Sequence, residues 1–238
     1  MARAVMRVLV TRPQEDAAET AALLAARGHE AVSAPLLGVH YHDGDALNLD
    51  GVQALLATSV NGIRAFIRRS ASRDIPVFAV GSQTAEAARV AGFTDVRNAD
   101  GNSQDLAAAV RGWASPQAGT LLHIAGAEAE GRLADLLSMA GYAVRTTVLY
   151  DVPAATTLPP AARDALDAGT LDAALFLSAR SATVFVEVVT KARLTAVCRR
   201  LIAVCISEAA AKPLAGLAFK EIRIAARPNQ ASLLDCLG

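Results

Sequence analysis

A short polar segment follows one of the apolar runs of this chain, where a strand would end and a helix begin. Val80 precedes Gly81 and Ser82, and Thr84 follows after Gln83. Backbone N–H groups and hydroxyls at the start of a helix can together hold an anion. An ordinary N-cap formed by Ser82 or Thr84 is the alternative interpretation. The segment lacks the glycine-rich dinucleotide fingerprint and the Gly-Lys-Ser/Thr phosphate loop.

Two other strand ends carry hydroxyls in the same kind of place. Ser59 and Asn61 follow the apolar run 54–58, and Ser178 and Arg180 follow the run 173–177. In open α/β sheets, ligands bind at the carboxyl ends of the strands. Capping of the next helix is again the alternative for the two serines. Because such a segment occurs in both halves of the chain, the pattern favours a ligand shared by two lobes.

Arg12 and Tyr150 are two further candidates. Arg12 follows the first apolar run, where a guanidinium could bind a carboxylate with two hydrogen bonds, although a plain surface arginine fits equally well. Tyr150 is one of three tyrosines, and its phenol could act as a weak acid or hydrogen-bond donor. A half-buried packing tyrosine is the alternative.

The sequence predicts no metal, no cofactor and no nucleic acid or membrane partner. His40 and His42 share a strand face, but no third ligand stands nearby in the sequence. Lys and Arg together number 23, as do Asp and Glu, so no net charge attracts polyanions. No apolar stretch approaches the ~20 residues of a membrane span. The three cysteines show no metal spacing, and we expect a soluble cytoplasmic protein.

The elements that position these residues include a repeat. Residues 7–38 and 120–151 both read as a strand, a helix that ends at a glycine (Gly28 and Gly141), and a second strand. The repeat indicates duplication of a whole α/β unit, and two similar lobes form a cleft that can bind a ligand.

Strands alternate with helices along the whole chain, which predicts an α/β fold with parallel sheets covered by helices on both faces. We expect two similar lobes of about five strands each, joined by a two-stranded connector. The predicted boundaries are a discontinuous domain 1 of residues 1–37 plus 153–238, domain 2 of residues 46–146, and connector strands 38–45 and 147–152. A split into two consecutive halves near residue 117 is the alternative.

Several segments, in their order and spacing, resemble the uroporphyrinogen-III synthase family over nearly the whole chain. These segments are Val8–Pro13, Leu56–Ile63, Val77–Ala85, Val148–Tyr150, Ala174–Ser178 and Ala225–Leu234. The resemblance implies two α/β lobes in the discontinuous arrangement. It also implies a reaction without a cofactor, in which the linear tetrapyrrole hydroxymethylbilane loses water, passes through a spiro intermediate and closes with its last ring inverted, giving uroporphyrinogen III.

The resemblance also implies roles for individual residues. Thr84 should bind substrate, Tyr150 should assist departure of the hydroxyl, and Ser59 and Ser178 should face the cleft. The full set of predicted substrate-binding residues is Thr84, Ser82, Gly81, Ser59, Asn61, Ser178, Arg12 and Arg180. One segment departs from the family pattern, because Ser207 is followed by Glu and alanines where a Gly and a Thr pair are usual. We expect a helix over 208–214 and no side-chain contacts from this turn.

The predicted partner is hydroxymethylbilane alone, bound by a monomer, with a transient contact to the preceding enzyme of the pathway left open. Two other classes of protein stay as alternatives. One is a two-lobed, non-enzymatic protein that binds a small anion or acts as a sensor. The other is a nucleotide-using enzyme, which the absence of phosphate loops disfavours.

Overall fold

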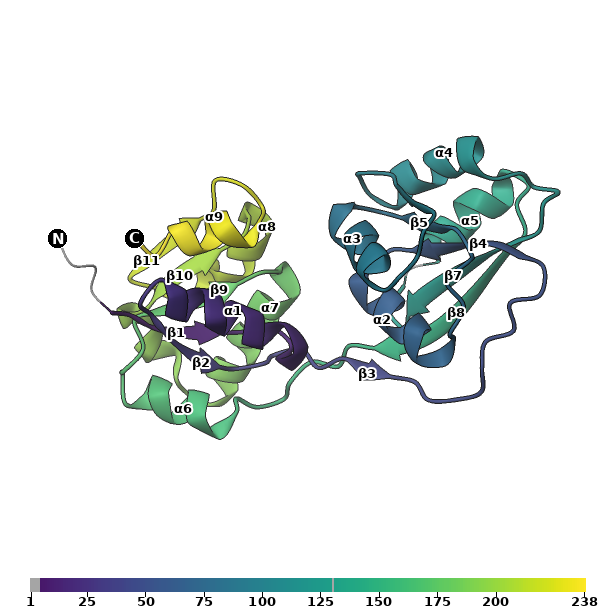
Figure 1. The fold of residues 1–238 in the computed structure, drawn as a ribbon. Helices are drawn as coiled ribbons and strands as arrows, with labels where there is room; N and C mark the ends of the chain where they lie inside the picture. Colours follow the sequence, from purple (N-terminus) through teal and green to yellow (C-terminus); the bar gives the residue numbers. More distant parts are fainter. Residues whose placement is uncertain (1–4, 130) are drawn as a thin grey trace. The chain divides into compact units, whose positions relative to one another are not determined.

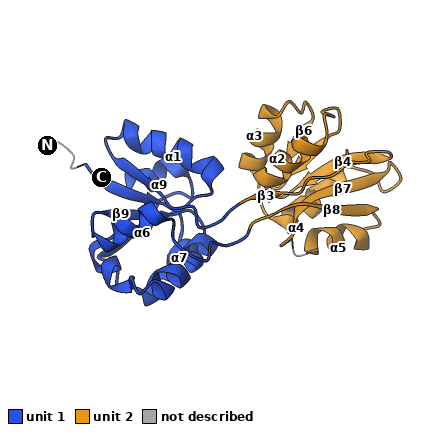
Figure 2. Cartoon of the chain, turned by 90° about the horizontal axis from the view of Figure 1, so that it is seen from below, with its two compact units in different colours: residues 1–38, 153–238 blue, residues 39–152 orange. Residues whose placement is uncertain are grey.

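A computed structural model describes residues 5–129 and 131–238, and it divides into two compact units (Figure 1, Figure 2). Unit 1 comprises residues 1–38 and 153–238, and unit 2 comprises residues 39–152. Unit 1 is therefore assembled from both ends of the chain, whereas unit 2 is a continuous segment.

Unit 1 contains a five-stranded, fully parallel sheet in the order β11-β10-β9-β1-β2. Its strands are β1 (Arg7–Val10), β2 (Glu30–Ser33), β9 (Ala173–Phe176), β10 (Ile202–Cys205) and β11 (Glu221–Ile224). All four residues of β9 and all four of β10 are buried. Burial of whole strands is typical of a parallel sheet with helices on both faces.

The helices of unit 1 follow its strands along the chain. They are α1 (Gln14–Ala26), α6 (Pro160–Asp167), α7 (Ala179–Lys191), α8 (Glu208–Ala211) and α9 (Gln230–Asp235), with 3-10 helices η1 (Thr195–Arg200) and η2 (Lys212–Gly216). The single helix predicted over 208–214 was wrong in its second half. Pro213 has no N–H to donate, and the chain tightens into η2 there.

In the part of unit 2 that the structure describes, six strands form one sheet in the order β3-β8-β7-β4-β5-β6. These strands are β3 (His40–Tyr41), β4 (Val52–Ala57), β5 (Val77–Ala79), β6 (Val96–Asn98), β7 (Thr120–Gly126) and β8 (Val144–Asp151). All neighbours are parallel except β3, which pairs antiparallel with the end of β8. The segment predicted as a connector strand, 147–152, thus largely belongs to this sheet, because β8 pairs with β7 along most of its length.

Helices α2 (Val60–Arg69), α3 (Ser82–Val90), α4 (Ser103–Trp113) and α5 (Arg132–Met139) cover the unit 2 sheet (Figure 1). Successive strand residues point to opposite faces, so the neighbours Leu55 and Leu56 enter two separate core clusters. One cluster includes Ile63 and Phe66 of α2, and the other includes Leu106 of α4. These parallel sheets flanked by helices confirm the predicted α/β class. Among the described residues, none forms part of a helix long and apolar enough to cross a membrane.

The two copies of the sequence repeat form equivalent elements in different units. The first copy is β1-α1-β2 and the second is β7-α5-β8. Gly28 and Gly141 follow the two helices with φ values of 81° and 87°. This left-handed conformation is the usual helix C-terminal stop, and it strongly favours glycine.

Candidate functional site

The carboxyl ends of β4, β5, β7 and β8 lie along one edge of the unit 2 sheet, because these strands run parallel. We call this margin the unit 2 edge; it comprises residues 58–61, 80–84, 126 and 150. Ser59 and Asn61 follow β4, Ser82 and Thr84 follow β5, and Tyr150 lies near the end of β8. The fold therefore brings to one edge residues that are up to 91 positions apart.

Tyr150 is held rigidly at the unit 2 edge. Its side chain packs into the core cluster that contains Ile63 and Phe66, and the residue is 7% exposed. No described residue hydrogen-bonds to its hydroxyl, yet this oxygen is not among the buried polar atoms that lack a partner, so solvent reaches it. A fixed ring with an accessible O–H can donate a hydrogen bond or a proton to a ligand.

A glycine makes room for the Tyr150 ring. Gly126, at the end of β7, pairs with Tyr150 across the two strands. A Cβ added at Gly126 would lie 2.8 Å from both Cε2 and Cζ of the ring and 3.1 Å from its oxygen. Carbon atoms in normal contact are about 3.5–4.0 Å apart, so any larger residue at this position would displace the ring.

The start of α3 has free donors. Gly81 occupies the N-cap position, where it has no side chain that could accept a bond, and neither Ser82 nor Thr84 caps the helix. A Cβ added at Gly81 would meet no atom within 4 Å. Thr84 is 5% exposed in the first turn, and the Ser82 side chain is exposed. The segment therefore does not form an ordinary side-chain cap. The N–H groups of the first turn are available to an anion.

Ser59, by contrast, caps its helix. Its Oγ accepts a hydrogen bond from the Asn61 N–H at 3.1 Å, which fixes the first turn of α2. The Asn61 Oδ1 accepts from Arg64 Nη1 at 3.4 Å. A serine that accepts from the backbone keeps its own O–H as a donor, so capping and ligand binding are compatible.

The unit 1 candidates lie at the ends of the neighbouring strands β1 and β9. Ser178 caps α7, with its Oγ accepting from the Ser181 N–H at 3.1 Å. Arg180 lies half-buried in the first turn of the same helix. Arg12 donates to Gln230 Oε1 at 2.9 Å and pairs with Asp16 at 3.3 Å. These contacts tie Arg12 to α1 and α9 within unit 1.

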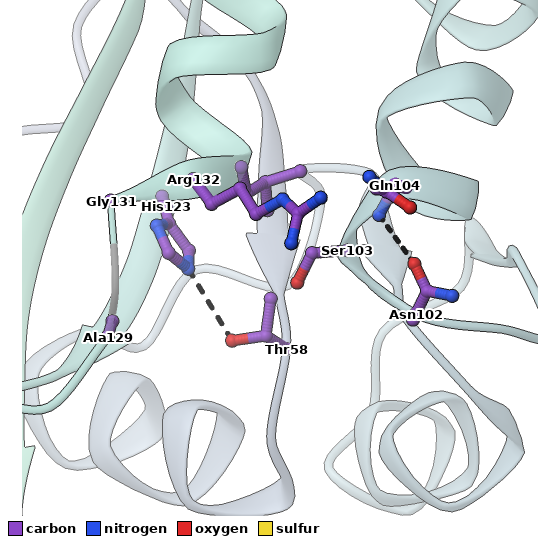
Figure 3. A pocket seen from close by; sticks show the side chains of 9 residues that line it. Thr58, Asn102, Ser103, Gln104, His123, Ala129, Gly131 and Arg132 are labelled. Atoms are coloured by element: carbon purple, nitrogen blue, oxygen red, sulfur yellow. Dashed lines mark hydrogen bonds between the residues drawn. The ribbon is translucent and has the colours of Figure 1, made fainter.

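A pocket that the sequence did not suggest lies at the starts of α4 and α5, beside the end of β4 (Figure 3). Its volume is about 450 Å³. The lining residues are Thr58, Asn102, Ser103, Gln104, His123, Ala129, Gly131, Arg132 and Leu133. We call this cavity the α4–α5 pocket. The pocket was missed because its members come from four separate segments that only the folded sheet brings together.

His123 is the buried polar group of this pocket. It is 3% exposed, and burial lowers the pKa of its imidazole. The Nε2 atom lies 3.5 Å from Thr58 Oγ1, while Nδ1 is buried without a partner among the described residues. The signal in the sequence was a single histidine inside the apolar run 121–125 of β7.

The antiparallel pairing of β3 with β8 brings an acidic residue that is distant in the sequence next to His40 and His42. Asp151 lies between them, with Oδ2 3.1 Å from His42 Nε2 and Oδ1 3.5 Å from His40 Nδ1. Even so, residues 5–129 and 131–238 contain no group of His, Cys, Asp or Glu that could hold a metal ion. The three side chains instead tie β3 to β8 next to Tyr150.

Comparisons with known proteins agree with this architecture. The family model of uroporphyrinogen-III synthase HemD matches residues 18–235. The fold is similar to that of uroporphyrinogen-III synthetase from Helicobacter pylori, with a TM-score of 0.66 and 15% identity over 98% of each chain. It is also similar to a mutant uroporphyrinogen III synthase from Thermus thermophilus, with a TM-score of 0.56 and 20% identity over 98% of this chain and 97% of that one. No curated protein matches the chain significantly.

Proposed function

This chain belongs to the uroporphyrinogen-III synthase family, the cofactor-independent cyclising lyases of tetrapyrrole biosynthesis, and we propose how its own residues carry out that reaction. Hydroxymethylbilane loses its hydroxyl as water, and ring closure with inversion of the last pyrrole gives uroporphyrinogen III. Closure without inversion gives the type I isomer. The protein must therefore hold one conformation of a reactive substrate, which is catalysis by positioning.

We propose that Tyr150 is the acid that assists departure of the substrate hydroxyl. The C–O bond breaks with its electron pair on oxygen, the phenol supplies the proton, and water leaves. The pyrrole left behind becomes an N-protonated, cationic azafulvene, and the phenolate recovers a proton from the substrate as the last ring attacks it and regains its aromaticity. The observation that carries this assignment is an accessible hydroxyl on a ring that is 7% exposed and confined by Gly126.

We propose that the start of α3 binds a substrate carboxylate. The N–H groups after Gly81 have no side-chain cap, and Thr84 and Ser82 place hydroxyls in the same turn. Charge-assisted hydrogen bonds from N–H and O–H groups are shorter and stronger than neutral ones. Neutral donors of this kind hold an acidic substrate without giving the protein a net charge.

The remaining candidates complete the proposal with smaller contributions. Ser59 and Asn61 supply an O–H and an amide at the unit 2 edge. Ser178, Arg180 and Arg12 supply the unit 1 contacts, although Arg12 is already paired with Asp16. We further propose that the chain works as a cytoplasmic monomer, with only transient contact to the enzyme that makes its substrate.

The proposed function is tested by supplying freshly prepared hydroxymethylbilane, oxidising the products to porphyrins and separating the isomers. Type III should dominate with the protein present, and type I without it. If type I remains the sole product at high protein concentration, the proposed function is wrong.

Replacement of one phenol by another tests the assignment of Tyr150. Tyr150→Phe should slow type III formation by roughly 10-fold or more, as loss of an acid–base group does. Tyr142→Phe is the matched control, because Tyr142 belongs to the other core cluster and donates to the Ala114 carbonyl at 3.2 Å. Equal rates in the two variants would remove Tyr150 from the mechanism and leave the function in place.

A further inference from the structure

The α4–α5 pocket has the size for part of a tetrapyrrole. Its volume of about 450 Å³ lies toward the lower end of the roughly 300–1,000 Å³ of small-molecule pockets, which suits one pyrrole ring with its acidic arms. A ligand of this size and charge needs a cation and several hydrogen-bond donors.

Arg132 is the cation of the pocket. It is exposed, and it forms no ion pair or side-chain hydrogen bond with any described residue. Arg132 is the first residue of α5, so its charge lies at the positive end of the helix, where acidic residues are normally preferred. An arginine at this position is unfavourable for the helix itself, and a bound anion would relieve the repulsion.

The acidic groups in the same helices do not neutralise Arg132. Asp105 of α4 is engaged in a capping box, where its Oδ2 accepts from the Asn102 N–H at 2.8 Å. Asp135 lies in the first turn of α5 and forms no ion pair with Arg132 among the described contacts. The guanidinium is therefore available to an external carboxylate.

His123 supplies an independent indication of a ligand. Figure 3 shows its ring in the wall of the pocket, with Nε2 directed at Thr58. Nε2 lies 3.5 Å from Thr58 Oγ1, and Nδ1 is a buried polar atom without a hydrogen-bond partner among the described residues. A buried polar atom without a partner destabilises a protein unless a ligand satisfies it. Ser103 places a further hydroxyl on the opposite wall (Figure 3).

We propose that the α4–α5 pocket binds the acidic arms of one pyrrole of the linear tetrapyrrole. Arg132 is the ion-pair partner, and His123, Thr58 and Ser103 are neutral hydrogen-bond partners. This inference rests on the proposed function, because it names a substrate of that reaction. It adds a positioning site within unit 2 that restrains one ring while the chain closes. Arg132 thereby becomes a specificity-determining residue that does not take part in the bond changes.

Removing the charge of Arg132 tests the proposal. Arg132→Gln should raise the KM for hydroxymethylbilane about 10-fold, the loss expected for a charge-assisted hydrogen bond, and change kcat less than about 2-fold. Arg132→Lys keeps the charge without the planar guanidinium, so its KM should lie between those of the wild type and Arg132→Gln. Arg111→Gln is the matched control, since Arg111 is exposed in the last turn of α4. An unchanged KM in Arg132→Gln overturns the proposal.

Thermal unfolding separates this role from a structural one. Because Arg132 is a cation at a helix N-terminus, Arg132→Gln should leave the Tm unchanged or raise it. A lower Tm would mean that the arginine stabilises the fold, and it would count against the proposal.

A binding measurement without turnover completes the test. Succinate is titrated into protein with ¹⁵N-labelled histidine, and the His123 ring signals are followed by NMR. Succinate should shift them, neutral succinamide should not, and Arg132→Gln should abolish the shift. Tighter binding of inorganic phosphate than of succinate would overturn the assignment of carboxylate. If succinate shifts the His123 ring signals but the protein makes no type III isomer, the proposed function is wrong and the pocket is an anion site with another role. If the wild-type protein makes the type III isomer and Arg132→Gln has an unchanged KM, the function stands and only the proposed role of the pocket is refuted.

Discussion

The contact between Gly126 and Tyr150 allows the catalytic assignment to be tested without touching the phenol. In Gly126→Ala the new Cβ would lie 2.8 Å from two ring carbons, about 0.7 Å closer than the ~3.5 Å of normal packing. The Tyr150 ring must therefore move by roughly that amount. Overpacking of this kind costs about 1–3 kcal/mol of stability.

Displacement of the Tyr150 hydroxyl should lower the rate as well as the stability. A shift of about 1 Å in a positioned group can lower a rate by roughly 100-fold, so we expect kcat for type III formation to fall about 10- to 100-fold. The assay is isomer-resolved turnover, with the free energy of unfolding measured in urea. Gly112→Ala in α4 is the control, because its Cβ would meet no atom within 4 Å and alanine should stabilise the helix by about 0.5–1 kcal/mol.

A double-mutant cycle shows whether the rate loss passes through the Tyr150 hydroxyl. In a Tyr150→Phe background, Gly126→Ala should still lower the stability but should slow type III formation no further than about 2-fold. A full-sized rate loss in that background would refute the reasoning. So would a Gly126→Ala protein that is destabilised and yet keeps the kcat of the wild type.

Two other outcomes are expected. Thr84→Ala should lower kcat/KM for type III formation roughly 10-fold while the protein stays folded by circular dichroism, because a charge-assisted hydrogen bond is lost; full activity would contradict the role given to α3. Burial raises the pKa of the Cys205 thiol to about 12 and that of Cys198 to about 11, from an ordinary 9.0. Just above pH 9 the thiols lose their protons only in the unfolded protein, which favours unfolding. The contribution of the buried thiols to the free energy of unfolding is therefore complete below pH 9 and is lost as the pH rises toward 12, by up to about 1.4 kcal/mol per pH unit for each thiol. Urea unfolding from pH 8 to 10 measures the slope, and an equal slope in Cys205→Ala would contradict it.

The secondary structure could be predicted closely because its signals are local. Strands such as β9 and β10 are buried throughout and read as apolar runs, and Gly28 and Gly141 mark helix ends through their backbone conformation. The helix predicted over 208–214 ends early as an α-helix, because Pro213 has no N–H to donate and the chain tightens into η2. The pairing of β8 with β7 was less visible, because strand neighbours are set by tertiary packing.

The candidate site could be predicted only in part. Ser59 and Ser82 follow strands in the same way, yet Ser59 caps its helix and Ser82 does not, since Gly81 takes the cap position. Capping and anion binding use the same residue types, so sequence alone does not separate them. The α4–α5 pocket and the contact of Asp151 with His42 depend on segments far apart in the chain, and no local pattern announces them.

The route of the chain through unit 1 bears on how the protein is made. The Arg7 N–H donates to Asp172 Oδ2 at 2.8 Å, across 165 residues of sequence. At about 5–20 residues per second, β1 leaves the ribosome about 8–30 s before its partner β9 exists. Until then the apolar edge of β1 has no neighbour on that side.

Early folding of unit 2 would shorten this search. The Gly38 N–H donates to the Pro153 carbonyl at 3.0 Å. The two ends of unit 2 therefore lie next to each other in space once β3 has paired with β8. About 50 residues (8–38 and 153–173) then remain to be closed instead of 165, which reduces the entropic cost of closure by about 1 kcal/mol. Pulsed hydrogen exchange during refolding should accordingly protect β7 before β1, and simultaneous protection would argue against that order. Folding of unit 2 thus brings the two segments of unit 1 close to each other during synthesis.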